Sequence, residues 1–315
     1  MTTNISKEKL QEIELVKDLK SLFLRAVRIR YYGKPGNHPV ITINSIKNII
    51  GDDRKYPSQI LMDFADRFLR EKPVRKRDKF ILNKIRNEGV SHSVFIMDLE
   101  DALLNNDDKI VEKEAAKLFV LADSPQAILE SVINLLMQDF NNFGKFSYHI
   151  LRAFAFSNVQ KENSWAFIQC VLKLANQFNF LGGVQKKNVE IDNFIEPVFN
   201  SNSINLISKF NAAYHIYKSD YVRTYLFKKS INTWVSEIKI DGKTMENKIS
   251  AEKGLINYCE FGGKYFIEKA ESILDMYSNT FLISKKLILL DSIRMLCKKI
   301  SPNKLGLINL KLDLI

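Results

Sequence analysis

The sequence predicts a mainly all-α protein, built as a helical bundle or a HEAT-like helical stack with a small basic helical module at its N-terminal end. Two observations predict this class. Only 12 glycines and 7 prolines occur among 315 residues, too few for the frequent turns of a sandwich or barrel. Apolar residues make up 46 % of the chain and recur at helical spacing in most segments, which indicates amphipathic helices around a sizeable core.

Residues 1–90 are predicted to form the basic helical module. A helix over residues 5–32 ends at the turn residues of YYGKPGNHP. Residues 40–43 have the pattern of a short strand, followed by a helix that is capped at Thr42 or Asn44 and stopped by Gly51. The next helix has Pro57 in its first turn. This order resembles a winged helix-turn-helix in outline only, and acidic residues on its second helix would meet phosphates badly.

The stretch 70–86, REKPVRKRDKFILNKIR, is the most basic part of the chain. Eight of its seventeen residues are Lys or Arg. We expect residues 73–86 to form one helix, about 20 Å long, that ends at Gly89. Val74, Ile81 and Ile85 fall on one face and should anchor it to the module. The opposite face should then present a basic ridge to solvent.

Residues 91–235 are predicted to form a helical-repeat region. MDLEDALLNNDD indicates a helix and a polar turn, KIVEKEAAKLFVLAD a second helix, and SPQAILESVINLLMQDF a third that starts at Ser124 and Pro125. Residues 236–315 should contain a hairpin-like connection at Asp241–Gly242 and two helices, over 251–277 and 281–300.

The helical-repeat region contains a repeated sequence pattern. KFSYHI ends at Ile150 and KFNAAYHI ends at Ile216, and a tryptophan follows each histidine by less than 20 residues. We expect residues 109–180 and 185–235 to be related helical units, with His149 superposed on His215. Coincidence is the alternative, because the rest of the two units aligns poorly.

Positive charge is concentrated in the first third of the chain. Residues 1–90 carry 20 Lys and Arg against 11 Asp and Glu, whereas residues 91–315 carry 27 against 25. Lysine is common throughout, so the arginines are more informative, and nine of the twelve fall between residues 25 and 86. Such asymmetry favours a polyanion or an acidic surface as the partner.

Arginine and tyrosine side chains suit nucleic acid, since guanidinium groups bind phosphates and tyrosine rings stack on unpaired bases. The alternative is a solvated helix face that binds nothing. The candidate binding residues are Arg25, Arg28, Tyr31, Tyr32, Lys72, Arg75, Lys76, Lys79 and Arg86.

Enzyme signatures are missing from the sequence. It has no phosphate-binding loop, no G-x-G-x-x-G, no H-E-x-x-H and no nucleophile elbow. An enzyme with a pocket around His149 and His215 remains the alternative, although paired core histidines without a recurring carboxylate or cysteine are more often structural. We therefore expect no metal and no cofactor.

The sequence also predicts a location. It has no apolar run long enough to span a membrane and begins with a polar helix instead of a signal peptide. Its three cysteines are far apart in the sequence, which fits a reduced, cytoplasmic compartment. The first hypothesis is therefore a non-enzymatic cytoplasmic protein. Its basic N-terminal module binds nucleic acid or an acidic protein surface, and its helical body offers a surface to a protein partner.

Overall fold

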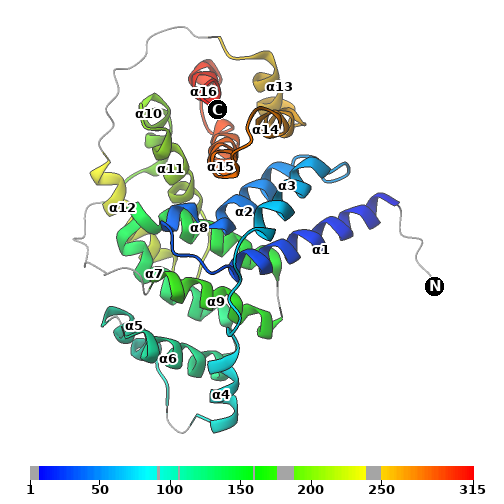
Figure 1. Cartoon of the computed structure of the whole chain (residues 1–315). Helices are drawn as coiled ribbons and strands as arrows, with labels where there is room; N and C mark the ends of the chain where they lie inside the picture. The colour runs from blue at the N-terminus through cyan, green and yellow to red at the C-terminus, as the bar shows by residue number, and fades with distance from the viewer. Residues whose placement is uncertain (1–6, 91–92, 106, 159, 176–187, 239–249) are drawn as a thin grey trace, which may run out of the picture.

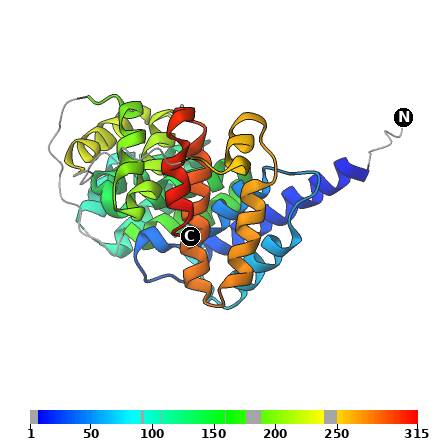
Figure 2. The same cartoon turned by 90° about the horizontal axis from the view of Figure 1, so that it is seen from above.

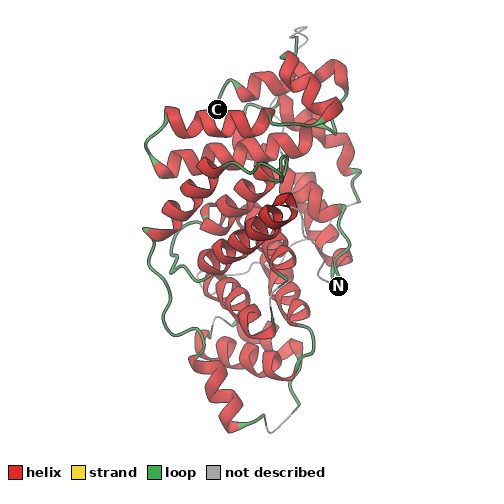
Figure 3. Ribbon diagram, turned by 90° about the vertical axis from the view of Figure 1, so that its right-hand side faces the viewer, coloured by secondary structure: helices red, strands yellow, loops and turns green. Residues whose placement is uncertain are grey.

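The computed structural model describes residues 7–90, 93–105, 107–158, 160–175, 188–238 and 250–315. These residues form α-helices joined by loops and short 3-10 helices, and no β-strand occurs among them (Figures 1 and 3). The predicted all-α class is therefore confirmed. None of the described helices combines the length and the hydropathy that a bilayer span requires.

The helices of the first half are α1 (Lys7–Val27), α2 (Pro39–Ile50), α3 (Gln59–Arg70), α4 (Phe80–Glu88), α5 (Ile96–Leu104), α6 (Asp108–Leu121), α7 (Pro125–Leu136) and α8 (Phe140–Ser157). Those of the second half are α9 (Lys161–Ala175), α10 (Ile195–Asn200), α11 (Ile204–Tyr217), α12 (Thr224–Glu237), α13 (Lys253–Phe261), α14 (Tyr265–Met276), α15 (Thr280–Cys297) and α16 (Leu305–Leu312). The 3-10 helices are η1 (Pro35–Asn37), η2 (Met137–Asp139), η3 (Ile191–Phe194) and η4 (Pro302–Lys304).

Four helices form the centre of the body: α2, α8, α11 and α15 pack against one another. In Figure 1, α4, α5 and α6 lie at one end of the molecule, and α13, α14 and α16 lie at the other. The first turns of α1 project away from the body (Figure 2). The N-terminal segment thus contributes a central helix, α2, to the same core as the rest of the chain. Division of the chain near residues 90 and 235 stays a prediction.

Helix α2 includes residues 40–43, for which a strand was predicted, so that prediction is wrong. Pro39 opens the helix, and the imidazole Nδ1 of His38 caps it by accepting a hydrogen bond from Val40 N–H at 3.2 Å. The predicted caps, Thr42 and Asn44, are buried within the helix. Burial on almost every side explains the outcome, since a helix that is surrounded by the core needs no polar face. Without the strand, the winged-helix outline has no support.

Three further helix boundaries differ from expectation. α1 ends at Val27, five residues before the predicted end. Pro57 lies before α3 and not in its first turn, and Ser58 caps the helix because its hydroxyl accepts a hydrogen bond from Leu61 N–H. The helix predicted over 251–277 is two helices, α13 and α14, separated where Gly262 and Gly263 have positive φ angles of 77° and 111°. Glycine adopts such angles without the steric penalty of other residues. The predicted starts at Ser124–Pro125 and stops at Gly51 and Gly89 are confirmed.

Two predictions about the second half of the chain, the hairpin and the duplicated unit, stay predictions. The hairpin at Asp241–Gly242 lies outside the described residues. His149 and His215 lie on α8 and α11, and each helix is followed by one that carries a tryptophan, α9 and α12. This arrangement is compatible with a duplicated unit, which stays a prediction.

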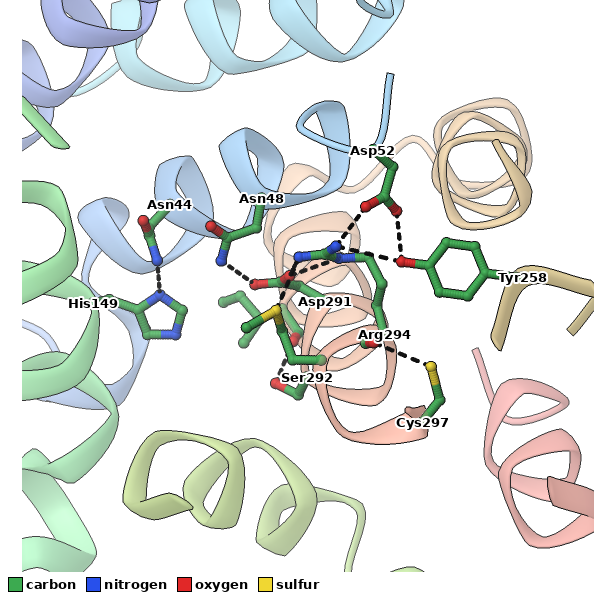
Figure 4. A network of polar contacts seen from close by, with 11 residues as sticks. Asn44, Asn48, Asp52, His149, Tyr258, Asp291, Ser292, Arg294 and Cys297 are labelled. Carbon is green, nitrogen blue, oxygen red and sulfur yellow. Dashed lines mark hydrogen bonds and ion pairs between the residues drawn. The ribbon is translucent and has the colours of Figure 1, made fainter. Parts of the chain in front are cut away.

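A buried polar network joins the central helices to α13 (Figure 4). Arg294 on α15 reaches Asp291 Oδ1 at 3.2 Å and Asp52 Oδ1, just after α2, at 2.7 Å. Asn48 donates to Asp291 Oδ2 at 2.9 Å, and the Tyr258 hydroxyl donates to Asp52 Oδ2 at 2.9 Å. Burial raises the pKa of Asp291, whose carboxylate depends on these partners because ions are costly in a low-dielectric core.

Candidate nucleic-acid interface

The two arginine-rich segments of the N-terminal part lie side by side. Ile29 and Val74 form an isolated antiparallel β-bridge. Arg30 N–H donates to Pro73 C=O at 2.8 Å, and Arg75 N–H donates to Arg28 C=O at 2.8 Å. The two basic segments thus meet through an extended bridge and not through a helix face.

Residues 73–79 are not helical, so the predicted single helix over 73–86 is wrong. Only the part from Phe80 onward is α-helix. Of the predicted anchors, Ile85 is buried and Ile81 is half-buried, but Val74 is 51 % exposed. The bridge explains the change: residues 73–75 pair with 28–30 through backbone hydrogen bonds that an α-helix would use internally.

Arg75 does not face solvent, contrary to prediction. Its guanidinium binds Asp78 through two hydrogen bonds, Nε to Oδ1 at 2.8 Å and Nη2 to Oδ2 at 2.7 Å. Its Nη1 donates to Ile29 C=O at 3.1 Å. The Arg75 side chain is only 11 % exposed. A bidentate pair of this kind fixes geometry, so Arg75 stabilises the bridge and is not available to a phosphate.

Several other candidates are engaged within the protein. Arg25 Nη1 lies 2.5 Å from Asp66 Oδ1 on α3. Lys72 lies with its Nζ 4.3 Å from the ring centroid of Phe68, and burial lowers the pKa of its ammonium. These cations are oriented by α3 and keep less capacity for an external anion.

The two candidate tyrosines, Tyr31 and Tyr32, differ in their surroundings. The hydroxyl of Tyr31 donates to Lys34 C=O at 2.9 Å, and burial raises its pKa to about 12. Tyr32 is 74 % exposed, with the guanidinium of Arg30 5.9 Å from its ring centroid. Only Tyr32 therefore presents an open ring face to a ligand.

The remaining candidates lie at the surface. Lys76 and Lys79 are exposed, and Arg28 is half-buried. Arg86, on α4, is exposed and lies 4.0 Å from Glu162, a distance at which a surface pair adds little. Of the ridge face proposed from the sequence, Lys76, Lys79 and Arg86 thus lie at the surface and Arg75 does not.

A cavity of about 1110 Å³ opens beside the bridge. Tyr31, Tyr32 and His38 line it from one side, and residues of α6 and α9 line it from the other. Its charged lining consists of six basic residues and three acidic ones: Arg30, Arg75, Lys76, Arg77, Lys109 and Lys173 against Asp78, Asp108 and Glu112. The sequence did not predict this cavity, because α6 and α9 are remote from the basic segments in the chain.

Internal pairing removes part of this charge. Arg75 is bound to Asp78, and Lys173 lies 2.8 Å from Glu112. The other lining cations, which we call the basic rim, are Arg30, Lys76, Arg77 and Lys109; they form no ion pair with any described residue. Arg30 and Arg77 were not among the candidates from the sequence, although both lie within the basic segments.

The wall of the cavity contains a cysteine and a histidine that do not form a catalytic dyad. His38 Nε2 lies 3.5 Å from Cys170 Sγ. Because Nδ1 already accepts from Val40 N–H, the proton of the neutral ring is on Nε2 and points at the sulfur. Burial lowers the pKa of His38 to about 3 and raises the pKa of Cys170 to about 12. The thiol therefore stays protonated and has no base to activate it.

His149 and His215 lie close together on α8 and α11. The ring of Tyr148 is 4.9 Å from the His149 centroid and 5.8 Å from the His215 centroid. His149 Nδ1 is 2.9 Å from the amide nitrogen of Asn44, and His215 Nε2 is buried without a hydrogen-bond partner among the described residues. Within the part of the chain that the structure describes, no carboxylate is hydrogen-bonded to either ring, and neither ring lines the cavity described above. The enzyme alternative therefore gains no support from this pair.

We expect the free energy of unfolding to fall as the pH drops below 6.5. Burial lowers the pKa of His38 to about 3 and of His215 to about 4, from an ordinary value of 6.5. Between these limits the unfolded chain takes up protons that the native protein does not, so acid favours unfolding. Each histidine contributes about 1.4 kcal/mol per pH unit. Urea denaturation between about pH 7 and about pH 5 measures the slope, which His38→Gln should make shallower; an unchanged slope would contradict a neutral His38.

The part of the chain that the structure describes contains no group of three or more His, Cys, Asp and Glu side chains placed to hold a metal ion. Comparison of the chain with protein-family models finds no match, and comparisons with curated proteins and with solved structures also find none.

Proposed function

We propose that the protein binds nucleic acid through the basic rim and the adjoining exposed Lys79. The main observation in support is the bridge between Ile29 and Val74, which brings two arginine-rich segments to the edge of one cavity. The rim cations are exposed and have no carboxylate partner among the described residues, so their charge is accessible from solvent. Unpaired cations on one face are what a phosphate backbone requires, because its charges release condensed counterions when they are neutralised.

The cavity favours a single strand over a duplex. The exposed ring of Tyr32 lies at its lining beside Arg30, and an aromatic face beside cations is a typical platform for an unpaired base. In a duplex the bases are already stacked and could not reach this ring. The volume of about 1110 Å³ slightly exceeds the usual range of ligand pockets, roughly 300–1000 Å³, so a base with its sugar fits.

The salt dependence of binding tests the proposal. We expect the triple variant Lys76→Glu, Arg77→Glu, Lys79→Glu to lose affinity for a mixed-sequence single strand. The slope of log affinity against log salt should flatten by about 2 for the three lost phosphate contacts. The measurement is fluorescence anisotropy at several salt concentrations, with single-stranded and duplex DNA and with RNA. These side chains are exposed, so the fold should be retained.

A matched control keeps the change in net charge the same. Lys229→Glu, Lys253→Glu and Lys299→Glu also replace three exposed lysines, on α12, on α13 and just after α15. If the control variant loses as much affinity as the rim variant, the contact is not at the rim. If the wild-type protein binds neither nucleic acid at low salt, the proposal is wrong, and an acidic protein surface becomes the remaining candidate partner.

Tyr32→Ala separates base stacking from phosphate contacts. Stacking contributes about 1–3 kcal/mol per base, so we expect weaker single-strand binding with an unchanged salt slope and unchanged duplex binding. Equal losses on single strand and duplex would contradict a stacking role for Tyr32.

We propose in addition that the helical body offers a surface to a protein partner and contains a duplicated unit. The repeated order of a histidine-bearing helix and a tryptophan-bearing helix in α8–α9 and α11–α12 supports the duplication.

A further inference from the structure

The wall of the cavity beside the bridge contains a buried polar atom that no described residue satisfies. Gln169 on α9 lines the cavity and is fully buried. Its amide Nε2 donates to Glu112 Oε1 on α6 at 3.1 Å. Its amide Oε1 is also buried, and it accepts no hydrogen bond from any residue that the structure describes. A buried acceptor without a donor is unfavourable, so a group of this kind indicates a donor that is supplied from outside the chain.

The orientation of the Gln169 amide is fixed by its neighbours. Lys173 Nζ lies 2.8 Å from Glu112 Oε2, so the carboxylate is held between a lysine and the amide. If the amide were turned over, its carbonyl oxygen would face a carboxylate oxygen, and two acceptors would repel one another. Nε2 therefore faces Glu112, and Oε1 stays free to accept a hydrogen bond.

We infer that Gln169 selects the base that enters the cavity, and that the cavity prefers cytosine and adenine, which have an exocyclic amino group, over uracil and thymine. The inference rests on the proposed function, because it assigns a base preference to the same cavity. Tyr32 lines that cavity too, but stacking on an aromatic ring tolerates every base. Discrimination between bases therefore needs a group that forms hydrogen bonds, and Gln169 Oε1 is the buried acceptor available for it.

An amino group suits this wall for two reasons. It projects beyond the ring of the base, so it can approach an oxygen that is buried in the wall. It also carries two hydrogens, and because the Gln169 amide is bonded to Glu112, a group that reaches Oε1 comes near the carboxylate, which attracts the second hydrogen.

Uracil and thymine present the opposite pattern. Each has a carbonyl oxygen where cytosine has its amino group, and the N–H of the ring lies between two carbonyls. A carbonyl at the wall would face the acceptors of Gln169 and Glu112 and would leave Oε1 unsatisfied. A site built to bond an N–H group rejects an analogue without it for this reason.

The experiment measures fluorescence anisotropy of the full-length protein with two pairs of labelled single strands of equal length. One pair is oligocytidylate and oligouridylate. The other is oligoadenylate and the same strand made from purine riboside, which lacks only the amino group. Strands of one length carry the same phosphate charge, so counterion release is equal within a pair. We expect the wild-type protein to bind the amino-bearing strand of each pair at least about fivefold more tightly, the effect of one net hydrogen bond.

Gln169→Met removes the amide and keeps the length of the side chain, so the preference within each pair should disappear. Gln126→Met is the matched control. Gln126 Nε2 also donates to a carboxylate, Glu130 Oε1 at 2.7 Å, but this pair lies on α7 and is not part of the lining of the cavity. The control variant should keep the preference of the wild-type protein.

Equal affinity of the wild-type protein for the two strands of either pair would overturn the inference, and a water molecule would then be the donor to Gln169 Oε1. This comparison needs no variant, so it does not depend on the folding of Gln169→Met. A preference that persists in Gln169→Met would also overturn the inference, since another group would then select the base. If the wild-type protein binds none of the strands at low salt, the proposed function itself is wrong and the inference falls with it.

Discussion

Replacement of Arg294 by alanine is expected to lower the free energy of unfolding by about 3–5 kcal/mol, because it leaves buried carboxylates without their cation. Arg294 contacts both Asp291, which is fully buried, and Asp52. The change would be measured by urea denaturation at neutral pH. The double variant Arg294→Ala, Asp291→Asn should recover part of the loss, since the most buried uncompensated charge is then gone.

Lys299 offers the control on the same stretch of chain. It is exposed and lies two residues after the end of α15, so Lys299→Ala should change the free energy of unfolding by about 0.5 kcal/mol or less. A loss of under about 1 kcal/mol for Arg294→Ala would be below the range for a broken buried pair. The network in Figure 4 would then not hold α2, α13 and α15 together.

Replacement of Arg75 by alanine is expected to cost roughly 3 kcal/mol, because Asp78 would be left poorly solvated and without its bidentate partner. The substitution also removes the hydrogen bond that the Arg75 guanidinium donates to Ile29 C=O, so the bridge between the two basic segments should loosen. Chemical denaturation gives the stability, and hydrogen exchange of the Arg30 and Arg75 amides, which form the bridge, reports on the bridge itself.

Arg77→Ala is the matched control for Arg75→Ala, since Arg77 lies two residues away and is exposed. It should leave the free energy of unfolding within about 0.5 kcal/mol of the wild-type value and should weaken nucleic-acid binding. Equal destabilisation by both substitutions would show that the exposure of these arginines does not decide their roles. The comparison therefore tests the division of the basic segment into a structural and a binding arginine.

Local signals in the sequence were sufficient for the helical class and for several helix ends. Pro125 starts a helix and Gly89, with a φ angle of 75°, stops one because their backbone preferences act within one turn. Residues 40–43 show where such signals fail. Their β-branched side chains favour a strand, but the segment is buried among α8 and α15, and burial outweighs a propensity of about 1 kcal/mol or less.

By itself, the sequence determined that the protein is helical and that its excess positive charge lies in the first 90 residues, since periodicity and composition are properties of the chain alone. Only the tertiary structure decided which of those charges remain available. Arg25 is paired with Asp66, 41 residues away, and Arg75 with Asp78, whereas Lys76 and Arg77 line an open cavity. The cavity itself needs α6 and α9. The physical reason is that pairing and burial depend on distances in space, which the folded core sets and which no local pattern encodes.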